Sequence, residues 1–490
     1  MFPGLETKIV DHAAYDRNVE VLQNAGVVLP RILELADPTV HLASLSAEIA
    51  VVDPDGPDTS NLFRVHWHNG RDRRSLVDVP GHVMLPEALT GVKAGIAVAL
   101  GNRFPMIGAH KVLAAYGCLI PRLLSGAFDV TRHRAVWPST GNYCRGGVAI
   151  GTLLGCRSIA VLPEGMSQER FDWLNRWIAD PDDIHRTPGT ESNVKEIYDA
   201  CHALAQDPEN LILNQFSEYG NYIVHRSVTG PALQRVAEHL NTDHGLRPRA
   251  FVAASGSGGT LAAGEHLKRI FGTDIGVIEA LECPTLLYNG YGEHIIQGIG
   301  DKHVPLIHNV MASDYVIGVS SSACDGLNLL FNTTAGRRYL ADHRGIGQEL
   351  MASLGSLGLS SIANVLGAIK YARYMDLCER DVVLTVATDG ADMYETEIGI
   401  AADEHFGGRF DEFTAAETFG RYVLGTGIDH LQQLGRFERE RIFNLGYYTW
   451  VEQQGISLED FDRRRDQSFW DGLLALVPLW DEMIAGFNGS

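Results

Sequence analysis

The sequence predicts an α/β fold: a mostly parallel sheet with helices on both faces, followed by a helical C-terminal extension. Between about residues 105 and 400, short β-branched runs alternate with segments of helical periodicity, and several intervening turns are rich in the chain's 52 glycines. Such alternation is typical of βαβ units, whose crossover helices cover both faces of a parallel sheet. From about residue 401 onward the pattern changes to long, charge-rich amphipathic helices such as residues 430–455.

Periodicity predicts the elements of the alternating region. The expected strands are residues 134–139, 156–163, 210–216, 249–255 and 275–281. The expected helices are residues 142–155, 167–180, 193–207 and 259–271. In roughly the first 95 residues, the segments 47–58 and 62–70 are typical of peripheral strands and turns. The C-terminal region should pack on the main body or on a second subunit because its aromatic residues need burial. These are Phe443, Tyr447, Tyr448 and Trp450.

Composition and charge restrict the class of protein. The chain has 490 residues, 45 % hydrophobic and 21 % charged, as in an ordinary globular protein. The formal net charge of −21 provides no positive field for nucleic acid or for an anionic membrane surface. The seven cysteines are scattered without a Cys-x-x-Cys pair, and no apolar run reaches ~18 residues. We therefore expect a cytoplasmic protein that binds neither nucleic acid nor membrane.

A glycine-rich turn follows the expected strand 249–255 and leads into the expected helix 259–271. It contains Gly256, Ser257, Gly258, Gly259 and Thr260. Glycines allow successive backbone N–H groups and a helix N-terminus to converge on a phosphate. The turn has neither the Gly-Lys-Ser/Thr of a P-loop nor the Gly-x-Gly-x-x-Gly spacing of a dinucleotide site. A tight strand-to-helix turn without any ligand is the alternative interpretation.

A second polar turn joins the expected strand 134–139 to the expected helix 142–155. It consists of Ser139, Thr140, Gly141 and Asn142. Small hydroxyls, an amide and free N–H groups at a helix start suit a carboxylate or a phenolate oxygen. Simple N-capping of the helix by serine or threonine explains the same residues equally well.

Lys111 stands at the head of an apolar, helix-favouring run, residues 108–117. Desolvation and the helix dipole disfavour the charged amine there, so its pKa should fall, and a neutral amine can form a Schiff base. Alternatively, the lysine stem packs while its charged end reaches solvent. Taken together, the glycine-rich turn, the polar turn and Lys111 match the phosphate, the 3'-oxygen and the aldehyde of pyridoxal 5'-phosphate.

From about residue 100 to residue 395 the chain resembles the fold-type II pyridoxal-phosphate enzymes, which include cysteine synthase, cystathionine β-synthase, threonine dehydratase and the tryptophan synthase β subunit. The segment GAHK (108–111) is similar to the lysine motif of the tryptophan synthase β subunit. The other motifs look like cysteine synthase. They are STGN (139–142), NQFSEYGNYIVHRSVTGP (214–231), ASGSGGT (254–260), HIIQGIG (294–300) and GLSSIANVLGAIKYA (358–372).

The resemblance implies a role for each matching residue. Lys111 would form the Schiff base and act as the catalytic base. Asn142 would contact the cofactor 3'-oxygen, Gly256–Thr260 the phosphate, and Ser360 the pyridine nitrogen. The substrate would be bound by Ser139, Thr140, Gly141 and Gln215. A neutral serine leaves the ring nitrogen largely unprotonated, which favours β-elimination or β-replacement over transamination.

The resemblance also implies two doubly wound parallel-sheet domains and, by analogy, a homodimer. Residues 1–95 would pack on the large domain, and residues 96–225 would form a smaller α/β domain with Lys111 and the polar turn. Residues 226–400 would form the larger α/β domain with the phosphate loop and Ser360, and residues 401–490 a helical extension.

The implied activity is β-elimination or β-replacement on a small L-amino acid, namely cysteine, serine or O-activated serine, through an aminoacrylate intermediate. The alternatives are a dehydratase or desulfhydrase, a γ-replacement enzyme, and a catalytically silent, cofactor-binding regulatory protein. Two departures from cysteine synthases leave the substrate open. Val112 and Leu113 replace the usual Asp-Arg, and Tyr143, Cys144 and Arg145 replace the usual Thr-Gly. Arg145 would meet an acidic substrate group or form a salt bridge on the helix surface.

Two further patterns carry little chemistry. His66 and His68 alternate on one face of an expected strand, but no nearby carboxylate or thiol completes a ligand set, so we expect no metal site. The charge-rich segments 437–443 and 462–466 are best explained as solvated or intersubunit helix faces with paired charges.

Overall fold

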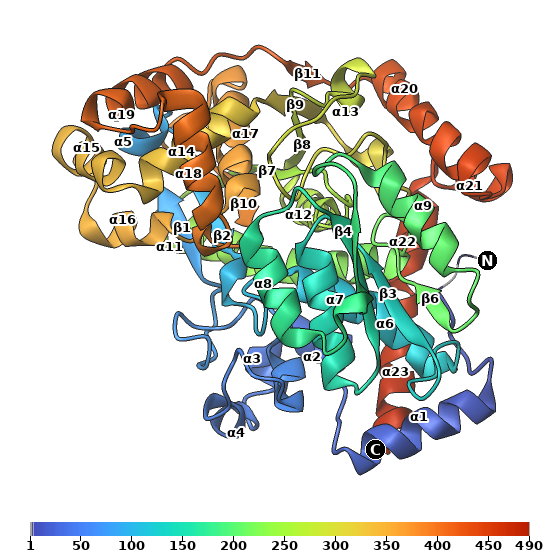
Figure 1. Cartoon of the computed structure of the whole chain (residues 1–490). Helices are drawn as coiled ribbons and strands as arrows, with labels where there is room; N and C mark the ends of the chain where they lie inside the picture. The colour runs from blue at the N-terminus through green and yellow to red at the C-terminus, as the bar shows by residue number, and fades with distance from the viewer. Residues whose placement is uncertain (1, 3, 490) are drawn as a thin grey trace.

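The computed structural model, which describes residue 2 and residues 4–489, contains two sheets flanked by helices (Figure 1). The larger sheet has the strand order β1-β2-β10-β7-β8-β9-β11. Its inner strands are parallel, whereas the edge strands β1 and β11 run antiparallel to their neighbours. The strands are β1 His82–Leu85, β2 Gly95–Leu100, β7 Arg247–Ala254, β8 Asp274–Ala280, β9 Tyr315–Val319, β10 Asp381–Ala387 and β11 Leu431–Gln433.

The smaller sheet has the order β5-β4-β3-β6, and all of its pairings are parallel. Its strands are β3 Arg134–Pro138, β4 Ser158–Pro163, β5 Ile184–Thr187 and β6 Asn210–Ile212. Together the two sheets confirm the predicted α/β class. The predicted strands at 134–139, 156–163, 210–216, 249–255 and 275–281 correspond to β3, β4, β6, β7 and β8.

The four helices that periodicity predicts, at 142–155, 167–180, 193–207 and 259–271, are all present among the helices that connect these strands. The connecting helices are α6 Lys111–Ser125, α7 Asn142–Leu153, α8 Gln168–Trp177, α9 Val194–Leu204, α10 Tyr219–Val224, α11 Gly230–His244, α12 Leu261–Phe271, α13 Thr285–Tyr288, α14 Ser321–Asn332, α15 Thr334–Arg344, α16 Gln348–Leu354 and α17 Leu359–Tyr374. The N-terminal helices are α1 His12–Asn24, α2 Ile32–Ala36, α3 Pro38–His41, α4 Ser46–Ala50 and α5 Glu87–Thr90. The C-terminal helices are α18 Glu395–Phe406, α19 Glu412–Phe419, α20 Arg436–Tyr447, α21 Leu458–Arg463, α22 Gln467–Leu474 and α23 Leu476–Asn488.

Both faces of the larger sheet are buried under helices. On β7, Phe251 and Ala253 join the apolar cluster that includes α11 and α12, whereas Ala250 and Val252 join the cluster formed by α14 and α17. Successive side chains of a strand point to opposite faces, so strands covered on both sides are apolar at every position. The carboxyl ends of the parallel strands are the edge of the sheet at which a site can form.

The N-terminal region differs from its predicted form. Residues 46–50 form α4 and residues Thr59–Arg64 form a 3-10 turn, so the prediction of strands at 47–58 and 62–70 is wrong. Local side-chain bonds favour the turn, since the Asp58 carboxylate accepts from the Ser60 N–H and the Asn61 amide donates to the Asp53 carbonyl. His66 and His68 follow this turn and do not alternate along a strand.

The boundary that we expect near residue 96 falls inside a strand. β2 begins at Gly95 and pairs with β10 in the larger sheet, so residues 95–100 lie with the segment 226–400 rather than with the smaller sheet. The chain crosses to the smaller sheet only after this strand, through α6. The division into four segments otherwise stays a prediction.

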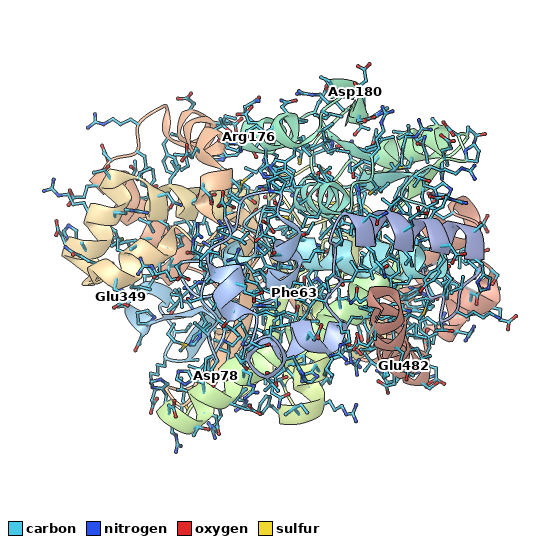
Figure 2. All side chains as sticks on the ribbon, turned by 90° about the horizontal axis from the view of Figure 1, so that it is seen from below. Phe63, Asp78, Arg176, Asp180, Glu349 and Glu482 are labelled. Carbon is cyan, nitrogen blue, oxygen red and sulfur yellow. The ribbon has the colours of Figure 1, made fainter. Side chains whose placement is uncertain are left out.

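The C-terminal region folds over the body of the molecule. It adds β11 to the edge of the larger sheet and then continues as α20–α23. The last helix, α23, contacts α1, α2 and α6 and lies beside α1 in Figure 1. Phe443 and Trp450 are buried, as their predicted packing requires, while Tyr448 is 65 % exposed. Charged residues such as Asp180, Glu349 and Glu482 lie at the rim of the molecule (Figure 2).

Trp450 is expected to be a major anchor of this region. Its ring is 1 % exposed and its indole N–H donates to the Val304 carbonyl at 2.7 Å. Trp450→Ala should lower the free energy of unfolding by about 3–5 kcal/mol, because it leaves a cavity and an unpaired carbonyl. Phe437→Ala is the matched control. Phe437 is 76 % exposed, so its removal should change stability by less than about 0.5 kcal/mol in denaturant titrations. Equal losses in the two variants would contradict the described packing.

Within the described residues, no single helix has the length and apolar composition to cross a membrane, and only α16 and α17 taken together across a 117° bend meet those two criteria.

Candidate active site

Lys111 is the first residue of α6 and is partly buried. Its Nζ lies 3.1 Å from Ser257 Oγ and 3.3 Å from Gln215 Oε1. The amine therefore faces the glycine-rich turn on one side and the segment after β6 on the other. Burial lowers the pKa of Lys111 from 10.5 to about 8, although the carboxylates of Asp301 and Glu191 oppose the shift. The direction agrees with the sequence-based prediction.

This pKa sets an expected pH dependence. A lysine amine reacts with an aldehyde only in its neutral form, so the rate at which cofactor-free protein takes up pyridoxal phosphate should rise with pH and level off above about 8. Stopped-flow absorbance at a series of pH values measures this rate. A rate that keeps rising toward pH 10.5, the ordinary lysine pKa, would contradict the burial of Lys111.

The predicted phosphate loop forms one side of a small hollow. Lys111, Gly256, Ser257, Gly258 and Thr260 line it, together with Ser360 at the start of α17. The backbone of the loop is packed too closely for side chains. A Cβ on Gly256 would lie 2.5 Å from the Gly298 carbonyl oxygen, and Gly258 has a φ of +81°. The loop runs directly into α12, so its N–H groups meet the positive end of a helix.

A second hollow adjoins the first at Lys111. Predicted substrate-binding residues line it, namely Ser139, Thr140 and Gln215, and Asn142 and Tyr143 complete that wall. Gly141 itself begins the turn into α7 with a φ of +141°, which glycine tolerates best. Its N–H donates to Ser139 Oγ at 2.9 Å and so fixes the turn. The structure thus brings the predicted site residues together around one amine, except that Gly141 and Gly259 line neither hollow.

Asn142 is held by groups that the sequence did not indicate. Its Nδ2 donates to Asp389 Oδ2 at 2.7 Å, and the same oxygen accepts from the Tyr394 hydroxyl at 2.9 Å. Arg170 from α8 adds an ion pair to Asp389 at 3.5 Å. This buried network connects the polar turn of the smaller sheet to the carboxyl end of β10. It fixes the amide of Asn142 and leaves one of its two N–H groups for a ligand.

Arg145 has neither of its two expected roles. It is fully buried, donates to Asn142 Oδ1 at 3.0 Å and to the Ile107 carbonyl at 2.9 Å, and lies over the Trp173 ring. It therefore forms no surface salt bridge, and its guanidinium is turned to the protein interior rather than to the substrate side. The prediction failed because every residue of α7 except Thr152 is buried, which the sequence does not show.

Asn221 is a further residue that the motifs did not single out. Its Nδ2 donates to the Gln215 carbonyl and to Ser257 Oγ, each at 3.0 Å. It therefore joins the segment after β6 to the glycine-rich turn and positions both partners of the lysine amine. Asn221 does stand in the segment 214–231 that resembles cysteine synthases, so its position in that motif was the available signal.

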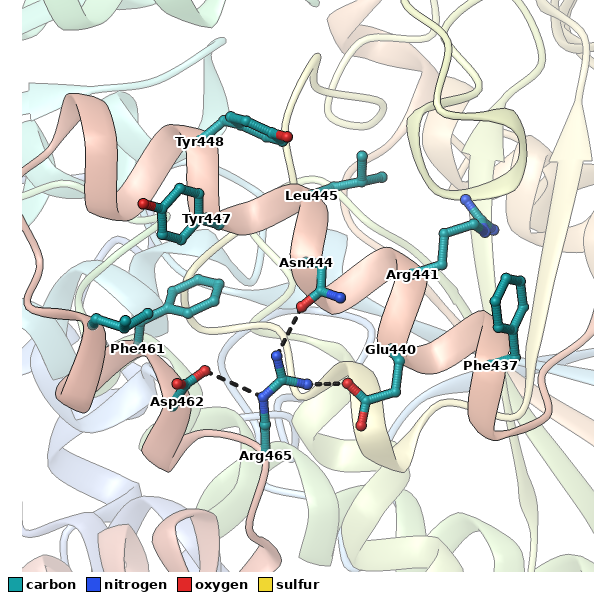
Figure 3. A pocket seen from close by; sticks show the side chains of 11 residues that line it. Phe437, Glu440, Arg441, Asn444, Leu445, Tyr447, Tyr448, Phe461, Asp462 and Arg465 are labelled. Carbon is teal, nitrogen blue, oxygen red and sulfur yellow. Dashed lines mark hydrogen bonds and ion pairs between the residues drawn. The ribbon is translucent and has the colours of Figure 1, made fainter.

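Another hollow lies away from this site. It has a volume of about 650 Å³ between α20 and α21, and its rim includes Phe437, Tyr448 and Arg465 (Figure 3). Arg465 pairs with Asp462 and Glu440 across it. None of the residues that line it also lines a hollow at Lys111. We therefore place the candidate active site at Lys111 and not in this hollow.

Comparison with known proteins decides the family. The family described as pyridoxal-phosphate dependent enzyme matches residues 89–330. A probable cysteine synthase of Bacillus subtilis is 30 % identical over 289 residues, which cover 59 % of this chain and 84 % of that protein. The chain belongs to the pyridoxal-phosphate-dependent enzyme family. Cysteine synthase B of Campylobacter jejuni is 31 % identical over 243 residues, covering 49 % of this chain and 71 % of that protein.

Solved structures of this family share the fold. A hydrogen sulfide-producing enzyme of Fusobacterium nucleatum aligns with a TM-score of 0.53 at 22 % identity, over 72 % of this chain and 95 % of that chain. An O-acetylserine dependent cystathionine β-synthase of Helicobacter pylori aligns with a TM-score of 0.52 at 21 % identity, over 67 % and 95 % of the two chains. These likenesses confirm the fold-type II architecture, and the C-terminal extension lies outside the segment that the family model matches.

The cofactor of this family is pyridoxal 5'-phosphate, and the first hollow suits it. The hollow has an amine whose pKa is lowered by desolvation, a tightly packed glycine loop before a helix, and the hydroxyl of Ser360. Asn364 Oδ1, a buried acceptor that also belongs to its wall, has no hydrogen-bond partner among the residues that the structure describes. These groups supply an aldehyde-reactive amine, N–H donors for a phosphate and a neutral partner for a ring nitrogen. The residues fit the cofactor.

Proposed function

We propose that the enzyme catalyses β-replacement on a small L-amino acid that carries a leaving group on its β-carbon, such as O-activated serine, serine or cysteine. The observation that carries this proposal is the position of Lys111. Its amine lies where the glycine-loop hollow meets the hollow of the polar turn. The relatives named cysteine synthase support the same class of reaction.

The residues around Lys111 would each have a defined task. Lys111, Asn142, Gly256–Thr260 and Ser360 would hold pyridoxal phosphate, which withdraws electrons from an amino acid bound to it and so weakens the Cα–H bond. The substrate α-carboxylate would bind at the start of α7, to Ser139, Thr140 and Gly141, with Gln215 beside it.

Lys111 would also act as the general base. Its low pKa leaves a substantial share of neutral amine near pH 8, and the neutral Nζ can accept the α-proton of the substrate. The Ser360 hydroxyl would donate a single hydrogen bond to the unprotonated ring nitrogen without adding charge, which favours reaction at the β-carbon over transamination. The buried walls exclude water from the proton transfer.

Product analysis tests this proposal. The enzyme with its cofactor is mixed with O-acetyl-L-serine, L-serine or L-cysteine, with and without sulfide or a second thiol. β-Replacement predicts a new amino acid only when a nucleophile is added. Pyruvate and ammonia as the main products would favour elimination, and reaction only with homoserine derivatives would favour γ-replacement. The relatives named cysteine synthase favour neither alternative, nor a silent regulatory protein.

We further propose that the enzyme is a cytoplasmic homodimer that binds no nucleic acid and no membrane. The net charge of −21 supports the lack of nucleic-acid binding. The seven cysteines are all unpaired, which suits a reducing compartment. Sedimentation velocity would give a single species of twice the chain mass if the dimer forms.

A further inference from the structure

Two buried carboxylates face the substrate-side hollow, and the proposed reaction uses neither. Glu191 is 1 % exposed and Asp301 is 6 % exposed, and both line the hollow with Lys111 and Gln215. Glu191 lies in the loop between β5 and α9 of the smaller sheet, whereas Asp301 follows the turn that ends at Gly300. The fold therefore brings the two acids together from opposite sides of the site.

Each acid has an oxygen without a hydrogen-bond donor. The Thr140 hydroxyl and the Gly298 N–H lie on the side of Glu191 where they oppose the rise of its pKa. Within the part of the chain that the structure describes, its Oε2 has no partner, and neither has Asp301 Oδ2. A buried carboxylate oxygen without a donor costs free energy, since it has lost its water and gained nothing. A ligand that donates hydrogen bonds would remove this cost.

The charges around the pair do not balance it. Glu191 faces Lys111, Arg170 and Asp301, and Asp301 faces Lys111 and Glu191. Arg170 is already paired with Asp389, and the amine of Lys111 is committed to the cofactor and the α-proton. Burial raises the pKa of Glu191 to about 8 and the pKa of Asp301 above its ordinary range. Tyr198 and Cys283 also lie near Asp301, but burial raises the pKa of each, so neither brings a positive charge to the pair. Once Arg170 is paired with Asp389 and the Lys111 amine holds the cofactor, neither cation is free to pair with the two acids.

We propose that Glu191 and Asp301 bind a cationic amine carried on the side-chain end of the amino-acid substrate or product, so that the enzyme prefers an amino acid with a second ammonium group. This inference rests on the proposed function, because it assumes that an amino acid occupies this hollow. An ammonium group has three N–H donors and one positive charge, which matches two unpartnered carboxylate oxygens. A second carboxylate on the substrate would be repelled.

Binding measurements on the enzyme with its cofactor test the preference. The probes are L-2,3-diaminopropionate, L-serine and L-aspartate, which share one backbone and differ in side-chain charge. Calorimetry and the change in cofactor absorbance both give the dissociation constant. We expect diaminopropionate to bind at least about tenfold more tightly than serine, because one well-made charged contact changes the dissociation constant by about a factor of ten or more. We expect aspartate to bind more weakly than serine. Equal affinities for diaminopropionate and serine would overturn the proposal.

Neutral variants identify the residues responsible. Glu191→Gln and Asp301→Asn keep the shape of each side chain and remove its charge. Each should weaken diaminopropionate binding at least about tenfold and change serine binding less than about threefold. Glu293→Gln is the control, because Glu293 is an exposed carboxylate in the same loop as Asp301. A preference that survives in both variants would overturn the assignment.

Proton release gives an independent readout. A cation between the two acids stabilises their ionised forms, so diaminopropionate should displace protons from the carboxyl groups near pH 7, whereas serine should not. Calorimetry in buffers of different ionisation enthalpy measures this release in the wild-type enzyme and does not depend on the variants' stability. No release would contradict the proposal. If no amino acid changes the cofactor absorbance at all, the proposed function itself fails.

Discussion

Lys111→Ala is expected to abolish the visible absorbance of the cofactor-loaded protein and to lower turnover by at least about 10³-fold, because the variant loses both the imine-forming amine and the general base. The amine is the only group that lies within hydrogen-bond distance of both Ser257 Oγ and Gln215 Oε1 among the contacts of the described residues. Absorbance spectra and single-turnover kinetics measure the two losses separately.

Two controls make this result specific. Lys302→Ala removes a lysine of the neighbouring segment that touches neither hollow, and it should keep both absorbance and turnover. Circular dichroism of Lys111→Ala should match the wild type, since the removed amine is polar and its removal does not disturb the apolar packing of α6. Full turnover in Lys111→Ala would contradict the assignment of the base.

Gly256→Ala should weaken cofactor binding by about 10- to 100-fold. The added Cβ would lie 2.5 Å from the Gly298 carbonyl oxygen. The Cβ is fixed to the backbone of the loop and the oxygen is itself a backbone atom, so no side-chain rotation can separate them. To relieve this clash the loop must move, at a cost of about 1–3 kcal/mol. Since about 1.4 kcal/mol corresponds to a tenfold change in the dissociation constant, this cost accounts for the expected loss of affinity. Titration of the cofactor-free variant with pyridoxal phosphate, followed by absorbance, gives the dissociation constant.

Gly347→Ala is the matched control for that variant. Apart from its chain neighbours, no described residue has an atom within 4 Å of a Cβ placed on Gly347, so cofactor affinity should stay within a factor of about two. Unchanged affinity in Gly256→Ala would show that the loop does not hold the phosphate, and it would remove the main structural argument for the first hollow.

The strand-turn-helix units could be predicted from the sequence because their apolar runs end at polar or glycine-rich turns. β3 and β7 begin and end within two residues of the predicted bounds, and the turns that follow them meet at Lys111. Local composition was sufficient to predict these strands and turns, because a strand buried on both faces is apolar throughout and a helix start needs polar or glycine residues. The resemblance to fold-type II enzymes assigned the same residues by motif.

The positions of the remaining site residues are determined by long-range packing, so the sequence alone could not predict them. Asp301 comes directly after the segment 294–300 that matches cysteine synthases, and Glu191 lies in a loop without any motif. Only the arrangement of the two sheets places them at one hollow. The network of Asp389, Arg170 and Tyr394 joins residues more than two hundred positions apart. The 3-10 turn at Thr59–Arg64 replaced a predicted strand because side-chain bonds outweighed β-propensity there.

The most direct test of the central claim is to find the lysine that binds the cofactor. The loaded enzyme is reduced with borohydride, which converts a carbon–nitrogen double bond into a stable amine, and the protein is then digested and mapped by mass spectrometry. The site geometry predicts one pyridoxyl group, on the peptide that contains Lys111. A label on any other lysine, or no label in protein that retains its absorbance, would contradict the account.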